Sequence, residues 1–65
     1  MSFNYWVRIE NSEEDLIFEG MIENVPSFHT LKTRIENRFY CCKYWIATQK
    51  PINLCDDCII YRKEW

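Results

Sequence analysis

The chain contains very little glycine, proline or histidine, with one Gly, two Pro and one His among 65 residues. Disordered and low-complexity segments are usually rich in glycine, proline and polar residues. Their scarcity, together with 48% hydrophobic residues, indicates a folded domain with an apolar core. The sequence also lacks a glycine-rich phosphate-binding loop. Because no other catalytic motif is present, we expect no enzymatic activity.

Long apolar runs are lacking as well, since no hydrophobic stretch exceeds four residues. A membrane-spanning helix needs about twenty. Residues 1–6 have neither a basic region nor an apolar segment followed by a cleavage site, so they do not resemble a signal peptide. We therefore expect a cytoplasmic protein that contacts no membrane. Thiols in that compartment usually stay reduced.

The net charge is only −2, but the acidic residues are concentrated near the start of the chain. Residues 1–24 contain six acidic side chains and one basic side chain, whereas residues 25–65 contain seven basic and four acidic ones. Nucleic-acid binding depends largely on a strong positive field. The acidic first third opposes such a field, so another protein is the expected partner. Nucleic acid remains an alternative through a local basic patch.

Alternating side chains near the N-terminus predict two strands that form a hairpin. Four apolar side chains share one face of residues 3–10, namely Phe3, Tyr5, Val7 and Ile9. Such alternation of β-formers is typical of a half-buried strand. The polar residues 11–15 predict a turn, and residues 16–22 a second strand. Within it, Gly20 indicates a bulge or a close backbone approach.

Helical spacing follows the hairpin. Apolar residues recur at three- and four-residue steps, at Phe28, Leu31, Ile35, Phe39 and Cys42. This stripe predicts a helix over residues 28–40 with one buried face, and Ser27 can cap its first free N–H groups. Alternation returns over residues 43–48 and 58–62, which predicts two more strands. The sequence therefore predicts an α+β fold with order β-β-α-β-β. We expect a single domain over residues 1–65, with one helix packed on one face of an antiparallel four-stranded sheet.

The four cysteines are the only residues with the spacing of a chemical site, and they lie at Cys41, Cys42, Cys55 and Cys58. A structural zinc ion takes four such ligands in a tetrahedron. His29, the single histidine, would lie about 18 Å from Cys41 along the predicted helix, so it does not complete a site. The all-cysteine tetrad instead requires Cys41 and its neighbour Cys42 to point toward one ion. We therefore expect no cofactor and cysteines packed as small apolar residues, with a zinc tetrad as the alternative.

Two tryptophans fall on the sheet face that the helix does not cover. If alternate residues of the first and third strands face the helix, Trp6 and Trp45 face the other way. Exposed tryptophans beside Arg8 and Lys43 would form an aromatic patch of the kind found at protein interfaces. The alternative is a second cluster in which Trp6, Trp45 and Trp65 pack on one another.

The acidic turn completes the expected interaction surface. Glu13, Glu14 and Asp15 would attract a basic partner surface and speed its approach. The sequence thus predicts a small intracellular protein-binding module, an inhibitor or adaptor of the kind that bacterial viruses also encode. We expect docking through the aromatic sheet face or an exposed edge strand, with a homodimer as a further expectation. The alternative function is a zinc-stapled miniature domain that binds nucleic acid.

Overall fold

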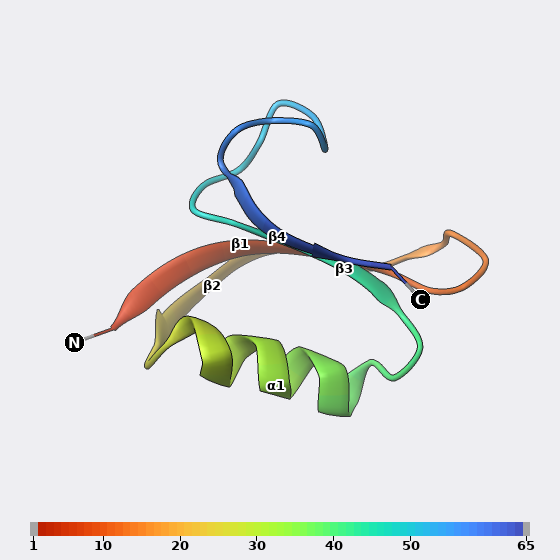
Figure 1. Cartoon of the computed structure of the whole chain (residues 1–65), viewed down its shortest axis with the longest axis horizontal. Coiled ribbons are helices and arrows are strands. Elements are labelled where there is room, and N and C mark those ends of the chain that lie inside the picture. Colours follow the sequence, from red (N-terminus) through yellow and green to blue (C-terminus); the bar gives the residue numbers. More distant parts are fainter. Residues whose placement is uncertain (1, 65) are drawn as a thin grey trace.

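The computed structural model describes residues 2–64 and consists of one sheet with one helix beneath it (Figure 1). The elements are β1 (Phe3–Glu10), β2 (Leu16–Val25), α1 (Phe28–Arg38), β3 (Lys43–Ala47) and β4 (Ile59–Lys63). All neighbouring strands are antiparallel, and the sheet order is β2-β1-β3-β4. The predicted α+β fold and its β-β-α-β-β order are confirmed.

The first strand of the chain lies in the interior of the sheet. β1 pairs with β2 on one side and with β3 on the other, so that Val7 lies opposite both Gly20 and Ile46. The predicted alternation holds for Tyr5, Val7 and Ile9, which belong to the core between the sheet and the helix, whereas Phe3 is 44% exposed. Both edges of β1 are therefore occupied, and the free edges of the sheet belong to β2 and β4.

The helix has a side-chain cap at its first turn and a change of backbone conformation after its last residue. Ser27 is the N-cap, and its hydroxyl oxygen accepts from the Thr30 backbone N–H at 3.1 Å. At the other end, the Phe39 N–H still donates to the Ile35 carbonyl, but Phe39 itself has non-helical angles (φ −123°, ψ 64°) and Cys41 has a left-handed φ of 62°, so the helix stops at Arg38 rather than at residue 40. Leu31 and Ile35 are its buried residues, as the apolar stripe predicted.

One detail of the hairpin differs from expectation. Gly20 lies in regular register opposite Val7, and the shifts fall instead between Phe3 and Tyr5 and between Ile9 and Glu10 of β1. The prediction of a bulge at Gly20 is therefore wrong. One shift leaves Ile17 without a partner in β1, and the other lies at residues 22–25, where Asn24 has a left-handed φ of 59°. Gly20 has no positive φ, so its backbone continues the strand without interruption.

Residues 48–58, which we call the covering loop, lie on the side of the sheet opposite the helix (Figure 1). Leu54 and Cys58 of this loop, with Ile59, pack against a cluster formed by Trp6, Trp45 and Ala47. One end of the sheet therefore has apolar contacts on both faces. Among residues 2–64, no helix has both the length and the apolar character needed to cross a membrane.

Side chain–backbone hydrogen bonds give the covering loop its shape. Asp56 accepts from the backbone N–H groups of Ile52 and Cys58, at 3.1 and 3.2 Å. Asn53 accepts from the Cys55 N–H at 2.8 Å. Such local bonds stabilise turns in place of a backbone ladder. They also lower the pKa of the Asp56 carboxyl, chiefly through the Ile52 N–H.

Replacing the helix cap tests this account of α1. We expect Ser27→Ala to lower the free energy of unfolding by about 1 kcal/mol, because the Thr30 N–H loses its acceptor. Chemical denaturation measures this change. Thr33→Ala, at an exposed position of the same helix, is the matched control and should not destabilise. Equal losses from both changes would show that the cap does not stabilise the helix.

Candidate functional site

The two tryptophans of the expected aromatic patch are buried. Trp6 is 3% exposed and Trp45 is 5% exposed. The prediction of an exposed aromatic sheet face is therefore wrong, because the covering loop packs on that face. The alternative of a second cluster is confirmed for these two residues, while Trp65 lies outside the described part of the chain.

This second cluster contains one polar atom with an incomplete environment. The Trp45 Nε1–H is buried and, within residues 2–64, has no hydrogen-bond partner. Leaving such a donor unpaired costs about 1–3 kcal/mol. The buried position of the indole ring is therefore stabilised by its apolar contacts with Ala47 and the covering loop rather than by a hydrogen bond from its N–H.

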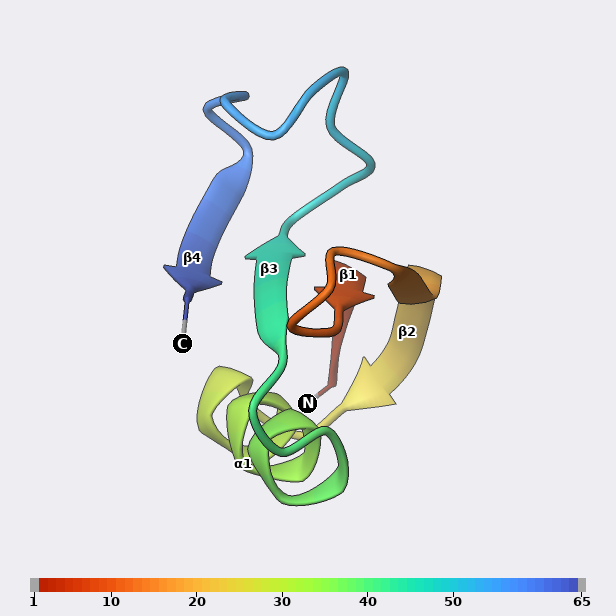
Figure 2. The same cartoon turned by 90° about the vertical axis from the view of Figure 1, so that its right-hand side faces the viewer.

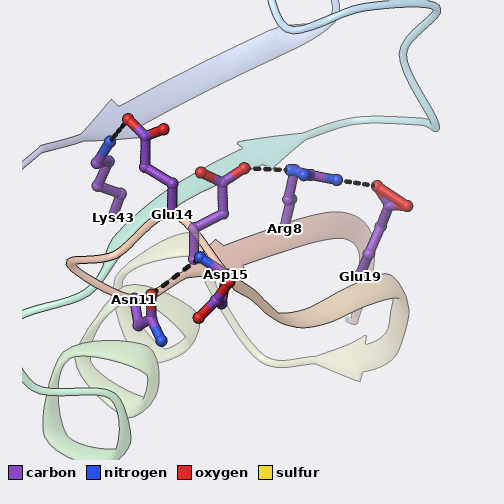
Figure 3. A network of polar contacts seen from close by, with 7 residues as sticks. Arg8, Asn11, Glu14, Asp15, Glu19 and Lys43 are labelled. Carbon is purple, nitrogen blue, oxygen red and sulfur yellow. Dashed lines mark hydrogen bonds and ion pairs between the residues drawn. The ribbon is translucent and has the colours of Figure 1, made fainter.

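The cationic side chains expected beside the tryptophans are engaged within the molecule (Figure 3). Arg8 donates from Nε to Glu10 at 2.7 Å and from a terminal nitrogen to Glu19 at 2.8 Å. The hydrogen bond to Glu10 is the main reason why the pKa of Arg8 is raised. Lys43 is paired with Glu14 at 3.3 Å. Arg8 and Lys43 therefore hold β1, β2, β3 and the hairpin turn together.

The acidic turn is an ordered structure (Figure 3). The side-chain oxygen of Asn11 accepts from the backbone N–H groups of Glu13 and Asp15, both at 2.9 Å. Glu14 adopts a left-handed backbone conformation with φ 66°. Glu13 and Asp15 are exposed. The attraction of a basic partner by this turn stays a prediction.

The cysteines lie in two places that the sheet keeps apart. Cys41 and Cys42 precede the first residue of β3, whereas Cys55 and Cys58 lie in the covering loop before β4. The Thr48 N–H donates to the Cys58 carbonyl at 3.1 Å, which places Cys58 beside the far end of β3. The five residues of β3 span roughly 16 Å at about 3.3 Å each. Zinc–sulfur bonds measure about 2.3 Å, so this arrangement does not join the two pairs in one tetrad.

The four thiols are free and differ in environment. Cys42 is buried in the core beneath the helix, and Cys58 is half-buried against the tryptophan cluster. Cys41 and Cys55 are exposed. Burial, followed by the charge of Asp56, raises the pKa of the Cys58 thiol. Within residues 2–64, no group of three or more His, Cys, Asp or Glu side chains is placed to hold a metal ion.

An exposed apolar strand was not among the predicted site residues. β2 is an edge strand of ten residues. Four of its large apolar side chains are exposed, namely Leu16, Ile17, Phe18 and Met21. The sequence signal for this surface is the apolar run at 16–18. In a strand with one buried face, apolar and polar residues alternate, so three consecutive apolar residues leave at least one apolar side chain on the other face.

A groove lies between this strand and the helix. It has a volume of about 330 Å³, and its lining includes Phe18 and Ile22 of β2 and Leu31, Arg34, Ile35 and Arg38 of α1. We call it the β2–α1 groove. The sequence signal is that Arg34 and Arg38 are four residues apart with no acidic residue at helical spacing from either. Such spacing leaves two like charges side by side on one helix face.

The buried tryptophan cluster makes Trp45 a test of stability rather than of binding. We expect Trp45→Ala to cost about 3–5 kcal/mol, as much as a core of this size usually supplies. Circular dichroism should show loss of the fold or a strongly lowered melting temperature. Ile52→Ala, at a residue 93% exposed, should change stability by less than about 0.5 kcal/mol. A fully stable Trp45→Ala protein would contradict the burial of this ring.

The thiol environments predict an order of alkylation by iodoacetamide, followed by mass spectrometry. Cys41 and Cys55 should react first, because their side chains are exposed. Cys58 should react more slowly, since its raised pKa reduces the thiolate fraction. Cys42 should react last, upon unfolding. Zinc that protected all four thiols at once would contradict their separation and support the tetrad.

In comparisons with known proteins, no family model, no curated protein and no solved structure matches this chain. The functional conclusion therefore depends on the exposed strand and the groove.

Proposed function

We propose that the chain is a small intracellular protein-binding module, an inhibitor or adaptor, that docks a partner protein along the free edge of β2. The observation that carries the proposal is the combination of an unpaired edge with exposed apolar side chains on one strand. β2 occupies the end of the sheet order, and Ile17 and Phe18 are 43% and 38% exposed. An edge strand offers unpaired backbone N–H and C=O groups to an added strand.

Two of the usual protections of an edge strand, lysine and proline, are absent from β2, although its pairing with β1 has two register shifts. Proteins normally shield such edges with lysine, proline or an inward-pointing charge. Residues 16–18 and Met21 contain none of these, and the carboxylate of Glu19 is paired with Arg8 inside the sheet. The other edge strand, β4, has only five residues. β2 is therefore the better docking edge.

The acidic turn contributes to this proposal through its position. Residues 11–15 lead directly into Leu16, the first residue of β2. Carboxylates at one end of the docking edge would attract basic residues that flank the docked segment and speed association. This contribution should fall as the salt concentration rises.

A charge placed on the edge tests the proposal. Tagged wild-type protein and the Ile17→Lys variant are used to capture partners from the native cell. We expect the variant to lose the partner protein that the wild type retains, because a lysine on the edge opposes strand addition. Amide hydrogen exchange on the purified complex should then show new protection in β2.

The matched control is Ile60→Lys, which places the same charge on the other edge strand at a residue 49% exposed. This variant should retain the partner. Equal capture by Ile17→Lys and the wild type would show that the β2 edge is not the docking surface. Loss of binding in both variants would assign the effect to charge in general.

A further inference from the structure

The β2–α1 groove has an unusual combination of an apolar lining and a cationic rim. Phe18, Ile22, Leu31 and Ile35 line it with aromatic and aliphatic side chains. Arg34 and Arg38 are exposed residues of α1 that also border it. A second hollow of the surface, formed by Arg34, Asn37 and Arg38, continues from the groove along the helix. An occupant of the groove must therefore satisfy both apolar surface and two guanidinium groups.

In the part of the chain that the structure describes, Arg34 and Arg38 have no counter-ion. Within residues 2–64, neither Arg34 nor Arg38 forms an ion pair or a side-chain hydrogen bond, whereas every other arginine does. Like charges four residues apart on a helix repel each other. A carboxylate placed between them would remove this repulsion and form charge-assisted hydrogen bonds.

On the opposite side of the helix, the charged side chains Lys32 and Glu36 have partners within the molecule. Lys32 lies over the Tyr61 ring at 4.8 Å from its centroid. Glu36 accepts from the Tyr44 hydroxyl and is paired with Lys63 at 3.3 Å. The charged groups on the side of α1 toward β4 therefore have partners within the molecule, whereas among residues 2–64 Arg34 and Arg38 have no ion-pair partner.

The carboxylates of the hairpin do not neutralise the groove either. Glu19 lies opposite Arg8 in the register and is paired with it on the face of the sheet away from the helix. Glu13 and Asp15 lie in the turn before β2 begins. Glu13, Asp15 and Glu19 therefore lie on other surfaces than the groove.

An added strand beside β2 would place its side chains in this groove. Neighbouring strands lie about 4.8 Å apart, and alternate side chains of each strand share a face. Phe18, Gly20 and Ile22 share the helix face of β2, because they lie opposite Ile9, Val7 and Tyr5 of the core. Every second side chain of the added strand would then point toward the helix, on the side of the sheet where Arg34 and Arg38 border the groove.

We propose that the partner presents an extended segment that combines apolar and acidic side chains on the face that meets the groove. Its apolar side chains cover Phe18 and Ile22, and its carboxylates bind Arg34 and Arg38. This inference rests on the proposed docking along β2 and adds the chemistry of the docked segment.

Selection from random peptides tests the chemistry directly. A display library of ten-residue peptides, the length of β2, is panned against the full chain. We expect enriched peptides to alternate in hydrophobicity and to carry Asp or Glu among their groove-facing positions. The double variant Arg34→Glu/Arg38→Glu should bind these peptides at least about tenfold more weakly, because charge-assisted hydrogen bonds are lost. Peptides with Lys in place of those acidic residues should regain affinity for the double variant.

Two control proteins separate the groove from charge and from folding. Lys50→Glu/Arg62→Glu reverses two exposed charges elsewhere on the molecule and should leave peptide affinity within about twofold. Gly20→Leu keeps both arginines and adds a side chain on the helix face of β2, between the groove residues Phe18 and Ile22. A Cβ at Gly20 meets only the Phe18 ring, at 3.6 Å, so the variant should fold and lose the peptides. Circular dichroism establishes that each variant is folded.

Each outcome distinguishes the two proposals. Peptides that require an intact β2 edge but bind Arg34→Glu/Arg38→Glu as well as the wild type would overturn the acidic chemistry and leave edge docking in place. Peptides unaffected by Ile17→Lys and Gly20→Leu would contradict edge docking itself. Sedimentation measures the remaining occupant, a second copy of the chain. A wild-type dimer that Ile17→Lys converts to monomer would replace the acidic segment with that second copy.

Discussion

The burial of both faces of β1 is the constraint on which the rest of the structure depends. On one face, Tyr5, Val7 and Ile9 lie in the core between the sheet and α1. On the other face, Trp6 lies in the cluster between the sheet and the covering loop. A strand with apolar side chains on both faces needs cover on both sides. The helix supplies one cover and the covering loop supplies the other. At this chain length a single core usually supplies only about 3–5 kcal/mol, so the second cluster is a substantial addition.

This constraint also explains where unsatisfied surface remains. The core beside α1 contains three residues of β1, two of β3 and Val25 of β2, and the covering loop packs on Trp6 of β1 and on Trp45 and Ala47 of β3. Figure 2 shows α1 beneath β3 and the end of β1, with β2 at one margin of the sheet. β2 consequently keeps exposed apolar side chains on an unpaired edge. The helix and the covering loop thus bury the inner strands β1 and β3, while the outer strand β2 stays accessible.

Much of the fold could be predicted from local patterns. Period-two alternation located the inner strand β1, and the apolar stripe with Ser27 as cap located α1. Both patterns report contacts between residues that are near in sequence or repeat on one face. The register shift in β2 was assigned to Gly20, because glycine is a common local signal for a bulge. The shifts lie instead at residues 16–18 and 22–25, and only the pairing with β1 locates them.

The site was less predictable because it depends on what covers each surface. Trp6 and Trp45 were correctly placed on the face away from the helix, but their exposure depended on residues 48–58. That segment has no periodic pattern, and its shape comes from Asn53 and Asp56 bonding to nearby backbone. The separation of the cysteine pairs likewise follows from the antiparallel pairing of β3 with β4. Neither arrangement can be read from spacing alone.

The central position of β1 has a consequence for synthesis on the ribosome. β1 emerges first, and β2 can pair with it early as a local hairpin. Its other edge must wait for β3, and Trp6 must wait for the covering loop, which emerges later still. Contacts between distant segments form slowly, and exposed strand edges are prone to aggregation during that interval. The nascent chain therefore passes through a stage in which an incomplete sheet exposes an indole ring and two apolar edges. Translation rate and chaperone contact at that stage are expected to influence the yield of folded protein.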